Sequence, residues 1–413
     1  MNKALNFAKR HSDWFFLMHL FWFEVARTLP HAILAIFLIN KFQADGSIVL
    51  ALQIIYYVAI FCFEIPSGFL SDIFNRKKIF LASVCAMIIA FPLIGFSDWL
   101  WLVFVGQFFY GVSSALSSGT VDLSILEQYE DEGQKKNLLA KKRMVFFGAA
   151  IVGGGLGPFV FNGIYNFLYL VSTSFFIISL FFGLLIIINE QERLKNENQL
   201  TYKEEVKQNI KLNLGYFKNK NYLFLFIGIL APIFIFGPFY NYWPVFYQAN
   251  GLDSQYFGIV YVVFQVLGLI CSYINKKMPL NKIYLFGAII FASLIFVLTI
   301  VFLKGNNFIY VFPLFLFFAN YYSFEMENVF HKHIKKNTGS SQVSILSSIS
   351  SFFSFSIYII LFVFALQINI NTASIIGGVL FGLIGLLSLF LVKFKTKPQK
   401  SELTKISAND QFD

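Results

Sequence analysis

The sequence predicts an all-α polytopic membrane protein, with twelve transmembrane helices in two six-helix bundles and both termini in the cytoplasm. Three observations predict this fold: the low charge, the repeated apolar stretches and the positions of the basic residues. Of the 413 residues, 57% are hydrophobic and only 13% are charged, whereas a soluble protein carries about 25% charged residues. This composition argues against soluble enzymes, nucleic-acid-binding proteins and secreted disulfide scaffolds.

The apolar stretches are long enough to cross a membrane. A helical span needs about 20 mainly apolar residues, because the hydrocarbon core is roughly 30 Å thick and a helix rises about 1.5 Å per residue. The first six predicted spans cover residues 14–40, 48–71, 78–97, 99–126, 142–165 and 168–189. The second six cover residues 221–247, 255–274, 282–303, 307–330, 342–366 and 372–393.

A long polar stretch between spans six and seven divides the chain. We therefore predict an N-terminal six-helix bundle over residues 1–190, a cytoplasmic linker over 191–220 and a C-terminal six-helix bundle over 221–393. The polar tail over 394–413 lacks hydrophobic periodicity and is expected to be disordered.

The basic residues orient the spans. All but three of the 32 Lys and Arg residues fall on the side of the termini; the exceptions are Lys41, Lys304 and, within span one, Arg27. Positive residues concentrate in cytoplasmic loops, so both termini are predicted to be cytoplasmic in a multi-pass protein of the cell (plasma) membrane. The net charge of +10 then reflects topology and contact with membrane lipid, and no nucleic-acid partner is expected.

The loop between spans two and three carries a motif. It places Gly68, Asp72, Arg76 and Lys77 in the order Gly, three residues, Asp, a short turn and two basic residues, with Asn75 in the turn. With the two groups of six spans, this motif resembles the major facilitator superfamily of secondary transporters, in which Gly is common at the turn position. Asn tolerates a left-handed turn nearly as well, so this departure is small.

The resemblance implies a conformational latch that closes the cytoplasmic side. In this interpretation Gly68 and Asp72 hold span two against a neighbour, while Arg76 or Lys77 pairs with acids at the inner end of span four. The expected acids are Asp122 and Glu127. The alternative is that the basic residues only anchor the loop in the cytoplasm.

Span five resembles part of the family's antiporter motif. Gly153, Gly157 and Pro158 match its first part, Gly, three residues, Gly-Pro, but Phe161 and Asn162 replace the closing glycine pair. Such a kink would let the two halves move against each other. The alternative is an ordinary kinked helix.

Two further motifs resemble a bacterial branch of the same family: Arg27 followed by Pro30 in span one, and Glu64-Ile-Pro-Ser-Gly68 in span two. One family feature is missing. Many proton-coupled members have an arginine near the start of span four, where this chain has Gln107.

Several charged residues lie inside the predicted spans. Such a residue costs roughly 2.5–3.5 kcal/mol on insertion scales, so it usually faces a cavity with a function. Glu24 and Arg27 lie three residues apart and can pair, as a cavity charge or as a pair that only orients span one. Glu64 is the first candidate for a proton carrier and Asp122 the second, and Glu325 lies toward the inner end of span ten.

Aromatic and amide residues of spans seven and ten suggest a cavity wall. Tyr240, Asn241 and Trp243 stand next to prolines, and Asn320 precedes two tyrosines. These side chains could stack on and hydrogen-bond a partly apolar organic substrate. The alternative places Trp243 and Tyr247 in an aromatic belt at the membrane surface.

These features predict a secondary active transporter of a small organic solute, with proton-coupled efflux as the first hypothesis. An importer or uniporter of a sugar or other metabolite is the second. A polytopic membrane enzyme is a weaker alternative, since the acidic run 127–132 is followed at once by lysines and is expected to be a solvated loop. No metal-ligand spacing and no nucleotide-binding loop is recognised, so no cofactor is expected.

Overall fold

A computed structural model describes residues 12–31, 33–43, 46–73, 76–117, 132–161, 165–186, 220–277, 281–333, 351–360, 363 and 370–392. In this part of the chain all regular secondary structure is helical. The linker and the tail fall outside these ranges, as do Asp122 and Glu127.

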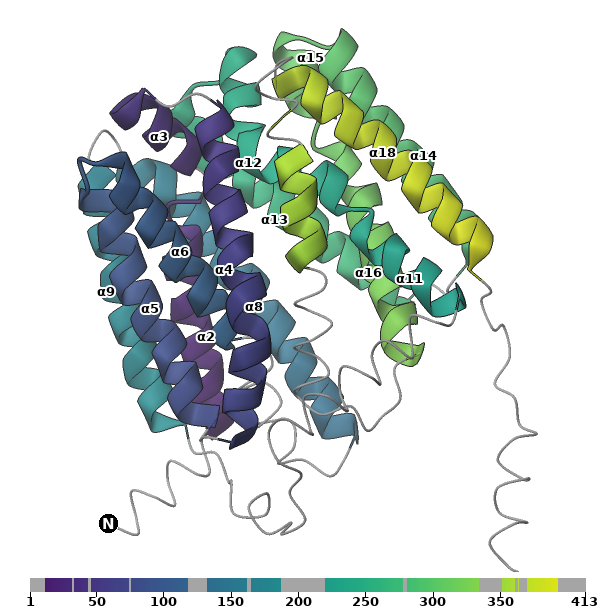
Figure 1. The fold of residues 1–413 in the computed structure, drawn as a ribbon. Helices are drawn as coiled ribbons and strands as arrows, with labels where there is room; N and C mark the ends of the chain where they lie inside the picture. Colours follow the sequence, from purple (N-terminus) through teal and green to yellow (C-terminus); the bar gives the residue numbers. More distant parts are fainter. Residues whose placement is uncertain are drawn as a thin grey trace, which may run out of the picture.

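The helices pack mainly within two groups (Figure 1), one from each half of the chain. The first group is α2 (Ser12–Thr28), α3 (Leu34–Phe42), α4 (Gly46–Ile73), α5 (Arg76–Phe96), α6 (Leu100–Ser117), α8 (Glu132–Phe161) and α9 (Tyr165–Leu185). The second group is α11 (Lys220–Leu230), α12 (Ile233–Ala249), η2 (Ser254–Tyr256), α13 (Phe257–Lys277), α14 (Lys282–Phe302), α15 (Gly305–Val311), α16 (Leu314–His333) and α18 (Ile370–Leu391). A shorter helix, Ser351–Ile360, also belongs to the second half.

Seven helices in the described ranges are long and apolar enough to cross a membrane, or up to eight if a bent pair between Leu223 and Ala249 forms one span. The total of twelve stays a prediction, because parts of predicted spans four and eleven lie outside the described ranges. Helix α8 begins at Glu132, before the predicted span 142–165. The Lys- and Glu-containing stretch before span five favours helix by propensity, so the helix extends beyond its apolar part.

Large apolar side chains cover the outside of the molecule. Phe390, Leu383 and Phe181 expose 72%, 61% and 58% of their surface. In water such a surface would favour association, whereas in a bilayer it contacts lipid tails. The apolar outer surface therefore agrees with a membrane protein.

Short turns interrupt the helix in three predicted spans. The breaks separate α2 from α3, α11 from α12, and α15 from α16, and they contain Pro30, Pro232 and Pro313. Proline has no N–H and clashes with the carbonyl four residues earlier. Each break therefore leaves a carbonyl without its helical donor in a setting where water is scarce.

Tyrosines supply the missing donor at two of these breaks. Pro232 deprives the Gly228 carbonyl of its partner, and the Tyr322 hydroxyl donates to that oxygen at 3.0 Å. Pro313 does the same to Ile309, whose carbonyl accepts from the Tyr247 hydroxyl at 3.3 Å. Neighbouring helices thus stabilise the two breaks with side-chain hydrogen bonds.

Glycines of α8 allow close packing on both of its sides. A Cβ at Gly153 or Gly157 would collide with the backbone of α2, and at Gly157 the obstacle is the Leu29 carbonyl beside the first break. On the other side, a Cβ at Gly258 of α13 would collide with the Gly155 carbonyl. The two halves therefore meet backbone to backbone where α8 ends and α13 begins, which is the predicted outer end.

Candidate functional site

An ion pair lies at the end of α2, just before the first break. Arg27 donates to one oxygen of Glu24, from Nε at 2.8 Å and from Nη2 at 2.6 Å. The Arg27 side chain is 28% exposed and the Glu24 side chain 8%. The predicted pairing is confirmed, and the guanidinium is the more accessible partner.

Aromatic rings of the first half surround the guanidinium. The Phe146 ring of α8 lies 5.7 Å from the Arg27 Cζ atom, and the Tyr110 hydroxyl of α6 lies beside it. The Tyr56 ring is 5.1 Å from that of Tyr110, and its hydroxyl is 3.0 Å from Ser114 Oγ. Four helices of the first half therefore converge on Arg27.

Rings of the second half complete the enclosure. His31, in the break after α2, lies 6.0 Å from the Tyr261 ring and 6.4 Å from the Tyr240 ring. Tyr57 stacks on Tyr358 at 5.1 Å with 24° between the planes. We call these six residues the tyrosine cluster: Tyr56, Tyr57, Tyr110, Tyr240, Tyr261 and Tyr358.

Of this cluster, only Tyr240 is among the site residues predicted from the sequence. Phe146 and His31 were not predicted as neighbours of Arg27. One sequence feature could have identified the tyrosines, namely their depth in the membrane. Tyr57, Tyr110 and Tyr358 each fall near the middle of a predicted span, where a hydroxyl needs a hydrogen-bond partner. Depth alone does not say which faces of the spans meet.

The other predicted acids lie elsewhere. Glu64 is buried seven residues beyond Tyr57, about 10 Å along α4 at 1.5 Å per residue, and Ser351 Oγ of the other half lies 3.5 Å from its Oε2. Glu325 is buried in the second half beside Cys271 and Tyr321. Glu24 and Arg27 are paired in α2, whereas Glu64 lies in α4 and Glu325 in α16, and a cavity shared by these residues stays a prediction.

The residues of the predicted aromatic wall also lie in different places. Tyr240 is half-buried next to His31, whereas Trp243 is fully buried in the second half against Phe257 and Phe264. Tyr247 is also fully buried, so the aromatic-belt alternative is wrong for both, because packing in the second half removes these rings from the surface.

Two amides complete that set. Asn320 is half-buried where α16 faces Gly268 and the Phe147 ring. The Asn241 side chain lies outside the described part of the structure.

Lys77 of the loop motif contacts α9. Its Nζ donates to the carbonyls of Leu184 and Ile186, each at 2.7 Å. These carbonyls lie at the C-terminal end of α9, where a cation is favourable. The expected pairing of Arg76 or Lys77 with Asp122 or Glu127 stays a prediction, because both acids lie outside the described ranges.

The remaining latch residues are only partly described. Arg76 is buried at the start of α5, and Gly68 and Asp72 lie in the last two turns of α4. The Asp72 side chain lies outside the described part, so the latch stays a prediction.

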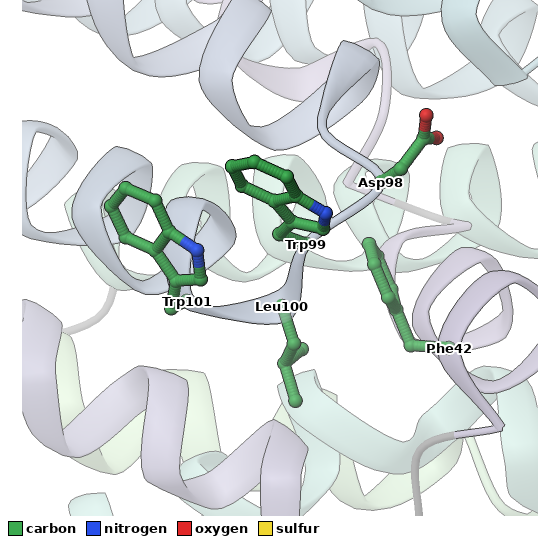
Figure 2. A pocket seen from close by; sticks show the side chains of 5 residues that line it. All are labelled: Phe42, Asp98, Trp99, Leu100 and Trp101. Atoms are coloured by element: carbon green, nitrogen blue, oxygen red, sulfur yellow. The ribbon is translucent and has the colours of Figure 1, made fainter.

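A shallow hollow lies away from this site (Figure 2), lined by Phe42, Asp98, Trp99, Leu100 and Trp101. The two tryptophans are 64% and 57% exposed and stack at 6.1 Å. Exposed tryptophans at the end of a span are typical of the membrane–water interface. We assign the hollow to that interface and not to the central site.

No group of three or more His, Cys, Asp and Glu side chains able to hold a metal occurs within the described ranges.

The sequence comparison identifies the family. The model of the Major Facilitator Superfamily matches residues 20–331. The chain belongs to the major facilitator superfamily. It is a multi-span membrane transporter of this superfamily, and not an enzyme.

Several known transporters are similar to this chain. An uncharacterised transporter of Buchnera aphidicola is 25% identical over 253 residues, which cover 58% of this chain and 62% of the relative. A solved POT family transporter in complex with 5-aminolevulinic acid is similar in fold, with a TM-score of 0.70, 13% identity and coverage of 92% and 96%. The nucleoside transporter NupG gives a TM-score of 0.69, 12% identity and coverage of 93% and 100%.

Proposed function

We propose that this chain is a secondary active transporter that moves a small organic solute across the cell membrane by alternating access, with protons as the coupling ion. The observation that carries the proposal is the Glu24–Arg27 pair, enclosed by rings from both halves of the chain. A substrate held there would contact both halves at once, so their relative movement would change its access.

Two further features support the proposed direction of transport and the proposed coupling to protons. The likeness of Gly153, Gly157 and Pro158 to the antiporter motif favours proton-driven efflux. Glu64 is the proposed proton carrier, because its carboxylate is buried at the contact between the halves, next to Ser351. Asp122 is the second candidate.

The latch is part of the same proposal. Gly68, Asp72, Arg76 and Lys77 would close the cytoplasmic side with Asp122 and Glu127, and Lys77 would exchange its carbonyl partners on α9 for an acid in the closed state. The bond to the Leu184 carbonyl is exposed and the bond to the Ile186 carbonyl is part-buried, so the first would be exchanged at little cost.

The test uses purified protein in liposomes that contain a pH-sensitive dye. Pooled metabolites and hydrophobic compounds are added under an imposed proton gradient, and substrate-dependent proton flux is expected. Glu64→Gln should abolish this flux, whereas Asp98→Asn, at a carboxylate with an 89% exposed side chain, should leave it unchanged. Full proton flux in Glu64→Gln would move the assignment to Asp122, tested by Asp122→Asn.

Facilitated transport is the second candidate, because Gln107 is buried in α6 where many proton-coupled members have arginine. Movement of a labelled substrate without proton flux in the same liposomes would favour this candidate and refute proton coupling.

A further inference from the structure

The central site offers one charged group to a substrate. Arg27 uses Nε and Nη2 to bind Glu24, and the Tyr110 hydroxyl lies beside the same guanidinium. Glu24 accepts both bonds and is the more buried partner. The accessible charge of the pair is therefore a donor and not an acceptor.

The positive end of the pair faces the rings. The Arg27 Cζ atom lies 5.7 Å from the centroid of the Phe146 ring, and the Arg27 side chain is 28% exposed against 8% for Glu24. A cationic substrate among these rings would be repelled by the guanidinium, whereas an anion would be attracted.

The other polar groups can adapt to an anion. Tyrosine hydroxyls and a neutral imidazole can donate or accept, so Tyr110 and His31 can direct an N–H or O–H toward an oxyanion beside Arg27. A guanidinium binds a carboxylate through two parallel hydrogen bonds, which adds geometric selectivity.

The uncharged part of the substrate must fit between rings. Phe146 lies against one side of the guanidinium, and the stacked Tyr57 and Tyr358 come from opposite halves. Flat rings pack well against such surfaces by offset stacking or edge contacts. The site therefore combines an oxyanion end with an aromatic end.

Resting on the proposed function, we infer that the transported solute is an organic acid in which a carboxylate, bound by Arg27, is joined to a flat ring held by the tyrosine cluster. The negative charge of Glu24 lies close to this carboxylate and repels it. Removal of the Glu24 charge should therefore strengthen binding, and removal of the Arg27 charge should abolish it.

The test is equilibrium binding to the full chain in lipid nanodiscs, measured with radiolabelled benzoate and indole-3-acetate. Benzamide and benzylammonium serve as neutral and cationic probes of nearly the same shape. We expect both carboxylates to bind at least about tenfold more tightly than either control probe. This comparison on the unaltered protein decides the substrate class even if a variant fails to fold.

The variants test the assigned groups. Carboxylate affinity should fall at least about tenfold in Arg27→Gln and less in Arg27→Lys, which keeps the charge but loses the planar fork. It should rise in Glu24→Gln and stay unchanged in Asp98→Asn. Equal binding of benzamide, preferred binding of benzylammonium, or no saturable carboxylate binding below about 10 mM would overturn the inference.

The two proposals fail in different ways. Carboxylate binding without exchange of labelled carboxylate across liposomes would refute the proposed function and keep the assigned ligand class. Transport of a cationic or neutral compound without carboxylate binding would refute the ligand class and keep the function.

Discussion

Replacing Tyr322 by Phe removes one hydroxyl from the interior of the second half. That hydroxyl donates at 3.0 Å to the Gly228 carbonyl, whose helical partner is missing because Pro232 has no N–H. Tyr322 is fully buried, so Phe keeps the ring packing and loses both the donor to Gly228 and the contact of 3.2 Å between the hydroxyl and Ser388 Oγ. A buried acceptor left without a partner costs about 1–3 kcal/mol, and hydrogen bonds between membrane helices measure up to about 1.7 kcal/mol. We expect a loss of about 1–2 kcal/mol in the free energy of unfolding.

A double-mutant cycle isolates this hydrogen bond. Pro232→Ala restores a backbone N–H that can bind the Gly228 carbonyl, so Tyr322→Phe should cost much less in that background. Free energies of unfolding would be measured by steric trapping in bicelles. The control is Tyr310→Phe, since Tyr310 is 74% exposed and should change little. An equal cost of Tyr322→Phe with and without Pro232 would refute the explanation of the break.

Two further predictions concern the contacts between helices. A methyl group in Gly258→Ala would overlap the Gly155 carbonyl, and such overpacking costs about 1–3 kcal/mol. This cost applies only in the conformation in which the two halves touch at the predicted outer end. We expect two spin labels at that end, one on each half, to move apart in Gly258→Ala. The control Gly148→Ala, with nothing within 4 Å of the added atom, should leave the distance between the labels unchanged. An unchanged distance in both variants would refute the contact. Lys77→Ala removes a cation from the end of α9 and should lower thermal stability by about 1 kcal/mol or less. Lys220→Ala, at an exposed position, is its control, and equal effects of the two would refute the capping role of Lys77.

Much of the fold was predictable because hydropathy is a property of contiguous residues. Helices α5, α9 and α14 begin and end within three or four residues of the predicted spans. The pairing of Glu24 with Arg27 was also predictable, because residues three apart share one face of a helix. The loop motif and the span pattern together predicted the family that the comparison then identified.

Long-range contacts decided the rest. The prolines were visible in the sequence, but whether each would kink or break its span depended on donors such as Tyr322, which lies 94 residues from Gly228. The positions of Glu64 and Glu325 relative to Arg27 likewise depended on how the helices of the two halves pack against each other.

The sequence by itself determined that this protein is a helical membrane transporter, because the requirement to bury about 20 apolar residues per span is met locally along the chain. Only the tertiary structure decided that Arg27 lies among rings of both halves and that Lys77 binds the end of α9. Apolar periodicity states which residues avoid water. It does not predict which side chains of distant helices are in contact. Those contacts depend on close packing at glycines and on hydrogen-bond donors that meet acceptors on neighbouring helices.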